Sequence, residues 1–188
     1  MLDSEEYFHL AVHAAKQGLH HSAMEYLYKC LEQEPENASA LFLLAAEHAE
    51  LGLYKRAIDG MKKSIALDHK LEMAYYQLAL LYIQQGDTAD AYPLWQQLVG
   101  HADDPVMREF ARGMLLSDTD TLQALSHMDN ALALPQQNDF LQKSIRNIAD
   151  SLRAVSDARG QQHLHSEAAA HEILVNTYKD SSFTRDDD

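Results

Sequence analysis

The chain has 188 residues, of which 46% are apolar and 23% are charged, as is ordinary for a protein with a packed interior. Its 15 Lys and Arg residues face 29 Asp and Glu residues, and the resulting formal charge of −14 argues against binding to nucleic acid or to anionic membrane surfaces. The single cysteine, Cys30, excludes an intramolecular disulfide and a cysteine-cluster metal site.

The start of the chain and its hydropathy predict a cytoplasmic protein. Residues 1–6 are acidic, whereas a secretory signal begins with positive charge followed by an apolar run. No stretch reaches the roughly 18 apolar residues of a membrane-spanning helix. We therefore expect neither a membrane nor a nucleic acid among the partners.

A repeat of 34 residues organises the first half of the chain. Gly18, Gly52 and Gly86 follow one another at this spacing. The same spacing relates three Leu-Ala pairs and three further alanines: Leu10-Ala11, Leu44-Ala45, Leu78-Ala79, Ala23, Ala57 and Ala91. A fixed period of this length is typical of stacked repeat architectures.

Each repeat is predicted to be a helical hairpin. Apolar residues recur at helical spacing on both sides of the glycine, which stands where the first helix must end and the chain must turn. Small alanines on both helices let the two backbones approach closely. One hairpin cannot cover its own apolar faces, so neighbouring hairpins have to stack.

This pattern resembles the tetratricopeptide repeat, whose small-residue pair, turn glycine and second-helix alanine match the residues given above. The resemblance implies an all-α fold, a right-handed α-solenoid of helical hairpins. It divides residues 1–100 into three repeats at 4–37, 38–71 and 72–100. It also implies a scaffold, adaptor or chaperone for protein–protein interaction. Because the sequence has no glycine-rich phosphate loop, G-x-S-x-G elbow or H-E-x-x-H motif, we expect neither an enzyme nor a cofactor.

The repeat weakens after residue 100, and residues 101–137 are expected to form a degenerate fourth hairpin. Asp104-Pro105 is a good start signal for a helix over 104–116. A second helix is expected over 120–134, with apolar residues at helical spacing: Leu122, Leu125, Met128, Ala131 and Leu132.

A capping helix is predicted for residues 138–159, ended by Gly160. Its apolar positions recur at helical spacing: Phe140, Leu141, Ile145, Ile148, Leu152 and Val155. Residues 160–188 are expected to be a polar tail with one short helix at 164–178.

The resemblance also implies where a partner binds, because the first helices of the repeats line a concave groove in this family. The residues at the groove positions are apolar: Phe8, Val12, Phe42, Ala46, Met73, Tyr76, Leu80 and Ile83. Some family members clamp the acidic C-terminus of heat-shock chaperones with Lys, Asn and Arg, and none of the five corresponding positions matches here. We therefore expect an apolar helical or extended segment of another protein or peptide as the partner.

Two alternatives for the groove are left open by the sequence. In the first, the chain's own C-terminal helix or a second copy fills the groove, which makes the protein a homodimerising module. In the second, the protein is a secretion chaperone whose groove holds a translocator protein. This alternative rests on a weaker resemblance, based on acidic composition and the apolar groove, to the tetratricopeptide-type chaperones of bacterial type III secretion.

The histidines suggest a further, less favoured alternative, a metal-dependent activity. Glu5, His9 and His13 are spaced so that one helical face would present all three. A stripe of this kind is usually solvated surface, and we expect no metal. His48 is predicted to be a core histidine with a hydrogen-bond partner, and Cys30 a buried packing residue.

Overall fold

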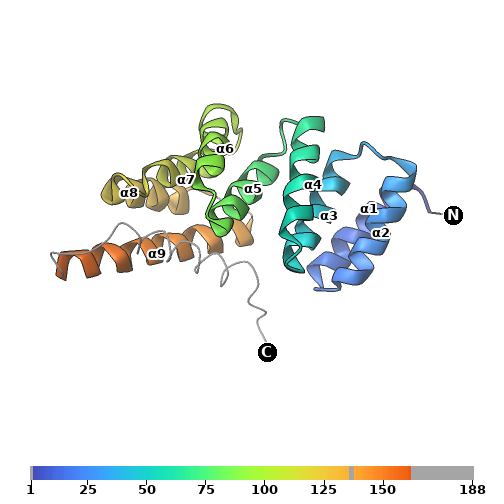
Figure 1. Cartoon of the computed structure of the whole chain (residues 1–188), viewed down its shortest axis with the longest axis horizontal. Coiled ribbons are helices and arrows are strands. Elements are labelled where there is room, and N and C mark those ends of the chain that lie inside the picture. The colour runs from blue at the N-terminus through green and yellow to red at the C-terminus, as the bar shows by residue number, and fades with distance from the viewer. Residues whose placement is uncertain (1, 136–137, 162–188) are drawn as a thin grey trace. The chain divides into compact units, whose positions relative to one another are not determined.

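The computed structural model describes residues 2–135 and 138–161, and within these ranges all regular secondary structure is α-helical (Figure 1). The helices are α1 (Ser4–Lys16), α2 (His20–Gln33), α3 (Ala38–Glu50), α4 (Tyr54–Leu67), α5 (Glu72–Gln85), α6 (Thr88–His101), α7 (Pro105–Leu116), α8 (Thr121–Ala133) and α9 (Asp139–Gln161). The predicted all-α class is confirmed. No helix in the described part of the chain has both the length and the hydropathy of a membrane span.

Polar side chains fix the first residues of α1 and α3. Asp3 Oδ1 accepts a hydrogen bond from the Glu6 amide at 2.8 Å, and the Asp3 amide donates to Glu6 Oε2 at 3.0 Å. Asn37 Oδ1 accepts from the Ala40 amide at 2.9 Å. These bonds satisfy amides that have no partner within the helix, so each helix begins where its repeat begins.

The three repeat glycines end α1, α3 and α5 in a left-handed backbone conformation. The φ angles of Gly18, Gly52 and Gly86 are +68°, +72° and +86°. The amide after each glycine donates to a carbonyl of the last helical turn: Leu19 to Ala14 (2.9 Å), Leu53 to His48 (2.8 Å) and Asp87 to Tyr82 (2.8 Å). Because a Cβ disfavours this conformation, glycine terminates the first helix at the same point of every repeat, as predicted.

The chain forms two compact units, and the boundary between them, after Leu78, lies within α5. In the first unit α1 packs on α2, α3 packs on α4, and α2 contacts α3. The buried core around α1 and α2 consists of Ala11, Leu27, Cys30, Ala40 and Leu44. Cys30 is fully buried, so its predicted packing role is confirmed.

Small residues bring α3 and α4 together. Ala45 on α3 and Ala57 on α4 are both buried, as their repeat positions predict. Gly60 on α4 lies directly against Ala45, because a Cβ built at position 60 would stand 2.8 Å from the Ala45 Cβ. This glycine, which the repeat pattern does not mark, therefore sets the closest approach of the two helices.

In the second unit α6, α7, α8 and α9 pack in succession. The start of α7 is confirmed, since Asp104 Oδ1 accepts from the Val106 amide at 2.9 Å and Pro105 occupies the first turn. Trp95 of α6 meets Phe110 of α7 edge to face, with ring centroids 5.7 Å apart. Aromatic packing thus joins the last regular repeat to the predicted fourth hairpin.

One prediction for the second unit is wrong, and two apolar positions of its predicted helices are exposed. The capping helix does not end before Gly160 but continues to Gln161, because one glycine weakens a helix without terminating it. Leu122 and Phe140, counted among the apolar positions of their predicted helices, are 75% and 41% exposed. They lie outside the buried stripes, which are Ala124, Met128 and Ala131 on α8 and Leu141, Ile145, Ile148, Leu152 and Val155 on α9. The short helix predicted at 164–178 lies outside the described residues.

Candidate functional site

Two helices of the first unit carry four of the predicted partner-binding residues. Phe8 and Val12 lie one turn apart on α1, and Phe42 and Ala46 occupy the equivalent positions of α3. The two helices contact each other, and all four residues are half-buried. We refer to these four residues as the α1–α3 face.

The α1–α3 face is held in place by the core of the first unit. Phe8 packs against the buried cluster around Ala11 and Leu27, which leaves part of its ring accessible. The 34-residue repeat puts Phe42 at the corresponding position of the next hairpin. A large apolar side chain with one side anchored and one side open suits contact with a partner, because little conformational freedom is lost on binding.

The remaining predicted residues lie on α5 and are less accessible. Met73 is half-buried, whereas Tyr76, Leu80 and Ile83 are 0%, 2% and 6% exposed. These three side chains are therefore covered in the folded chain. For Leu80 and Ile83 the sequence carries a signal that the repeat alignment ignores. Residues 78–83 are uninterrupted apolar sequence, and a helical segment that is apolar on all sides is buried on all sides.

A part-buried hydrogen bond joins the start of α2 to α3, and its α3 residue, Glu47, directly follows Ala46 of the α1–α3 face in the sequence. His20 Nδ1, at the start of α2, lies 2.8 Å from Glu47 Oε2. The Glu47 side chain is only 4% exposed and that of His20 is 31% exposed. Because a carboxylate only accepts, the His20 nitrogen donates this hydrogen bond. The sequence indicated no role for His20, and no local pattern could, since its partner is 27 residues away.

His48, the neighbour of Glu47, is buried as predicted. Burial, followed by the charge of Arg56, lowers the pKa of His48 from its ordinary value. Its Nε2 has no hydrogen-bond partner among the described residues. The imidazole is held in its neutral form, because protonation would place a charge in the interior.

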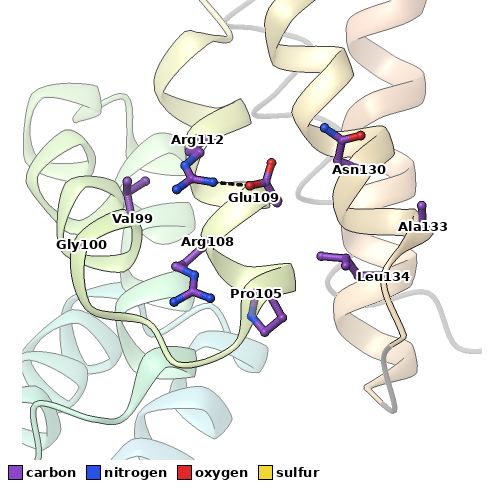
Figure 2. A pocket seen from close by; sticks show the side chains of 9 residues that line it. All are labelled: Val99, Gly100, Pro105, Arg108, Glu109, Arg112, Asn130, Ala133 and Leu134. Carbon is purple, nitrogen blue, oxygen red and sulfur yellow. Dashed lines mark hydrogen bonds and ion pairs between the residues drawn. The ribbon is translucent and has the colours of Figure 1, made fainter.

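A cleft of about 730 Å³ opens within the second unit, between α6, α7 and α8 (Figure 2). It is lined by Val99, Gly100, Pro105, Arg108, Glu109, Arg112, Asn130, Ala133 and Leu134. Figure 2 shows the two arginines and Glu109 extending from α7, with Asn130 and Leu134 on the opposite side from α8 and its C-terminal end. The sequence did not indicate this cleft, because its lining residues come from three helices and meet only through tertiary packing.

Both carboxylate oxygens of Glu109 are hydrogen-bonded. Oε2 lies 2.8 Å from His127 Nδ1, and Oε1 accepts from the guanidinium of Arg112. Burial alone would raise the pKa of Glu109, but the hydrogen bond from His127 and the charge of Arg112 outweigh it and hold the pKa below its ordinary value. Glu109 is therefore ionised at neutral pH, and its charge is balanced within the cleft.

This arrangement predicts an acid-sensitive contribution to stability. A carboxyl whose pKa is lowered on folding stabilises the native state above its unfolded pKa, and that contribution is lost as the pH falls through the folded pKa. Glu109→Gln is expected to lower the free energy of unfolding by about 1–2 kcal/mol at pH 7 and by progressively less below pH ~4.5. Urea unfolding of the full chain at several pH values measures the difference. Glu36→Gln, at an exposed position, is the control, and its difference from wild type in the free energy of unfolding should not change with pH. A loss of stability in Glu109→Gln that is the same at every pH would contradict this prediction.

The predicted histidine stripe does not assemble a metal centre in the described residues. Glu5 Oε1 and His9 Nε2 are 3.8 Å apart, and both side chains are strongly exposed. Across residues 2–135 and 138–161, no group of three His, Cys, Asp or Glu side chains is placed to hold a metal ion. The side chains of Glu5, His9 and His13 therefore form exposed surface of α1 and give no support to a metal-dependent activity.

Comparison with protein families identifies the repeats. The tetratricopeptide repeat model matches residues 7–37, which cover most of α1 with α2, and residues 74–94, which cover most of α5 and the first half of α6. The intervening hairpin of α3 and α4 lies outside these matches, although its turn glycine has the same backbone conformation. No curated protein matches the chain significantly.

Several solved structures share the fold at low sequence identity. MamA from Desulfovibrio magneticus RS-1, from residue 41 to its end, is 16% identical with a TM-score of 0.58, covering 95% of this chain and 92% of that one. YrrB, a TPR protein with an unusual peptide-binding site, is 18% identical with a TM-score of 0.60, covering 95% and 88%. A tetratricopeptide repeat protein from Parabacteroides merdae ATCC 43184 is 14% identical with a TM-score of 0.60, covering 95% and 77%. The likeness establishes the fold class as the all-α solenoid.

Proposed function

Since the chain carries tetratricopeptide repeats and has the all-α solenoid fold that they build, we propose that it is a non-catalytic scaffold whose α1–α3 face binds an apolar segment of a partner protein. The fold supports a role in protein–protein interaction. The observation that carries the finer proposal is the set of half-buried apolar residues at equivalent positions of two contacting helices: Phe8, Val12, Phe42 and Ala46.

The chemistry of this face defines the kind of partner. Two aromatic rings flanked by smaller apolar side chains match the apolar side of a peptide or helix. The peptide-binding site for which YrrB is described supports the same general use of the fold. On α5, Met73 is half-buried and stays part of the proposal, whereas Tyr76, Leu80 and Ile83 are buried and are assigned to the interior of the folded chain.

The pair of substitutions Phe8→Asp and Phe42→Asp tests the proposal. Each places a charge where the partner is expected to bury apolar surface, and the loss for a buried aromatic contact is about 2 kcal/mol or more per residue. Proteins that co-purify with the full chain are quantified by mass spectrometry for wild type and variant. We expect at least one partner to fall by about tenfold or more. Tyr76 is left out of the test, because an aspartate at a fully buried position would unfold the protein.

The matched control is Leu122→Asp, which introduces the same charge at a strongly exposed apolar position of α8. Circular dichroism and the urea midpoint confirm that the variants remain folded. Unchanged capture by the folded Phe8→Asp, Phe42→Asp variant would refute the assignment of the face. A wild-type dimer in light scattering that becomes a monomer in this variant would instead assign the face to a second copy of the chain.

A further inference from the structure

We propose that the cleft between α6, α7 and α8 is a second binding site, which takes a carboxylate of a partner peptide together with an adjacent apolar side chain. The site lies wholly within the second unit and shares no residue with the α1–α3 face. The proposal rests on an unbalanced positive charge in a chain of strongly negative charge, and on the apolar walls around it.

Arg108 supplies the unbalanced charge. Its Nη1 donates to the backbone carbonyl of Ala102 at 3.1 Å, which orients the guanidinium without neutralising it. No carboxylate in the described part of the chain forms an ion pair with Arg108. The remaining donors of its planar fork match the two oxygens of a carboxylate, the geometry in which arginine binds most strongly.

The other charges of the cleft cancel. Arg112 follows Arg108 by one helical turn, so the two side chains are neighbours on α7 (Figure 2). Arg112 is paired with Glu109, whose second oxygen is bonded to His127. The charges of Arg108, Arg112 and Glu109 therefore sum to +1 at neutral pH, and Glu109 forms its ion pair with Arg112 and not with Arg108.

The walls of the cleft indicate which group of the ligand lies beside its carboxylate. Val99, Pro105, Ala133 and Leu134 present apolar surface, and Asn130 presents an amide that both donates and accepts. A volume of about 730 Å³ is in the range of sites that hold small ligands or a few peptide residues. An acidic residue, or a free C-terminus, beside an apolar side chain fits this combination, whereas a small inorganic anion would leave the apolar walls unused.

Three N-acetylated tripeptides are the probes for this site: acetyl-Leu-Glu-Leu-amide, acetyl-Leu-Gln-Leu-amide and acetyl-Leu-Gln-Leu with a free C-terminal carboxylate. Each is titrated to about 10 mM into the ¹⁵N-labelled full chain and followed by amide chemical shifts. We expect at least one carboxylate peptide to shift the amides of Val99, Gly100, Asn130 and Leu134, and the uncharged peptide to bind about tenfold more weakly or not at all. Binding of the glutamate peptide would indicate that the site takes a side-chain carboxylate, and binding of the peptide with a free C-terminus would indicate a C-terminal carboxylate.

Substitution of the arginine separates this site from general electrostatics. Arg108→Gln is expected to weaken binding by about tenfold or more, and Arg108→Lys, which keeps the charge but loses the fork, by less. The control is Arg146→Gln, which removes an exposed arginine from α9 and should leave binding unchanged. The Phe8→Asp, Phe42→Asp variant should also bind normally, so failure of either proposal is distinguishable from failure of the other.

Several results would overturn the proposal. They are the absence of shifts at these amides with every peptide, equal binding of the uncharged peptide, binding that survives in folded Arg108→Gln, and inorganic phosphate binding as tightly as the carboxylate peptides. Retention of the remaining amide shifts shows that each variant is folded.

Discussion

Replacing His20 by alanine is expected to lower the free energy of unfolding by about 2–3 kcal/mol. The substitution leaves the Glu47 carboxylate, which is almost fully buried, without its hydrogen-bond donor. Leaving a buried polar group without its hydrogen bond costs about 1–3 kcal/mol, and more when the group is charged, as an ionised carboxylate is. Urea unfolding of the full chain at pH 7 measures the loss.

The neighbouring residue provides the matched control for this prediction. His21 faces Glu25 at 3.5 Å, but its side chain is 92% exposed. His21→Ala is therefore expected to change stability by less than about 0.5 kcal/mol, as for other exposed pairs. Glu47→Gln in the His20→Ala background should recover part of the loss, because an amide is cheaper to bury than a charge. Equal effects of His20→Ala and His21→Ala would show that the buried pair has no special role.

Replacing Gly60 by alanine is expected to lower the free energy of unfolding by about 1–3 kcal/mol, although alanine is the better helix former. The added methyl would stand 2.8 Å from the Cβ of Ala45, and neither group can rotate away. The helices α3 and α4 therefore have to separate, which loosens their packing. Urea unfolding again measures the difference.

A double substitution and a second glycine test the physical cause. Ala45→Gly with Gly60→Ala moves the methyl from one helix to the other, so the two changes together should cost less than the sum of the separate changes. Gly100→Ala is the control, since nothing lies within 4 Å of a Cβ built there, and it should be neutral or stabilise by up to about 1 kcal/mol. A Gly60→Ala variant as stable as wild type would refute the assigned close approach.

The repetitive part of the fold was open to prediction because its causes are local. The spacing of Gly18, Gly52 and Gly86 predicts turns that the structure contains, with left-handed backbone at all three. The cap formed by Asp104 and the proline after it predict the start of α7 to within one residue. In each case the deciding interaction joins residues a few positions apart, so the pattern of residue types is sufficient.

The candidate site was predictable only in part. Its α1 and α3 residues follow from repeat register, and the structure leaves Phe8 and Phe42 half-buried. For Tyr76, the register specifies a position on the helix but not which other segments cover it. For Leu80 and Ile83, the uninterrupted apolar sequence of residues 78–83 indicates burial, and this general rule outweighs the analogy between repeats.

By itself, the amino-acid sequence determined the helical hairpins, their turns and the residues placed on α1 and α3, because periodicity and capping act over a few neighbouring residues. Only the tertiary structure decided that Glu47 meets His20, that Gly60 touches Ala45, and that Arg108 stands without a carboxylate partner in a cleft. These contacts join separate helices or depend on the space between them. Burial, close approach and charge balance are properties of that packing, and residue spacing along the chain does not encode them.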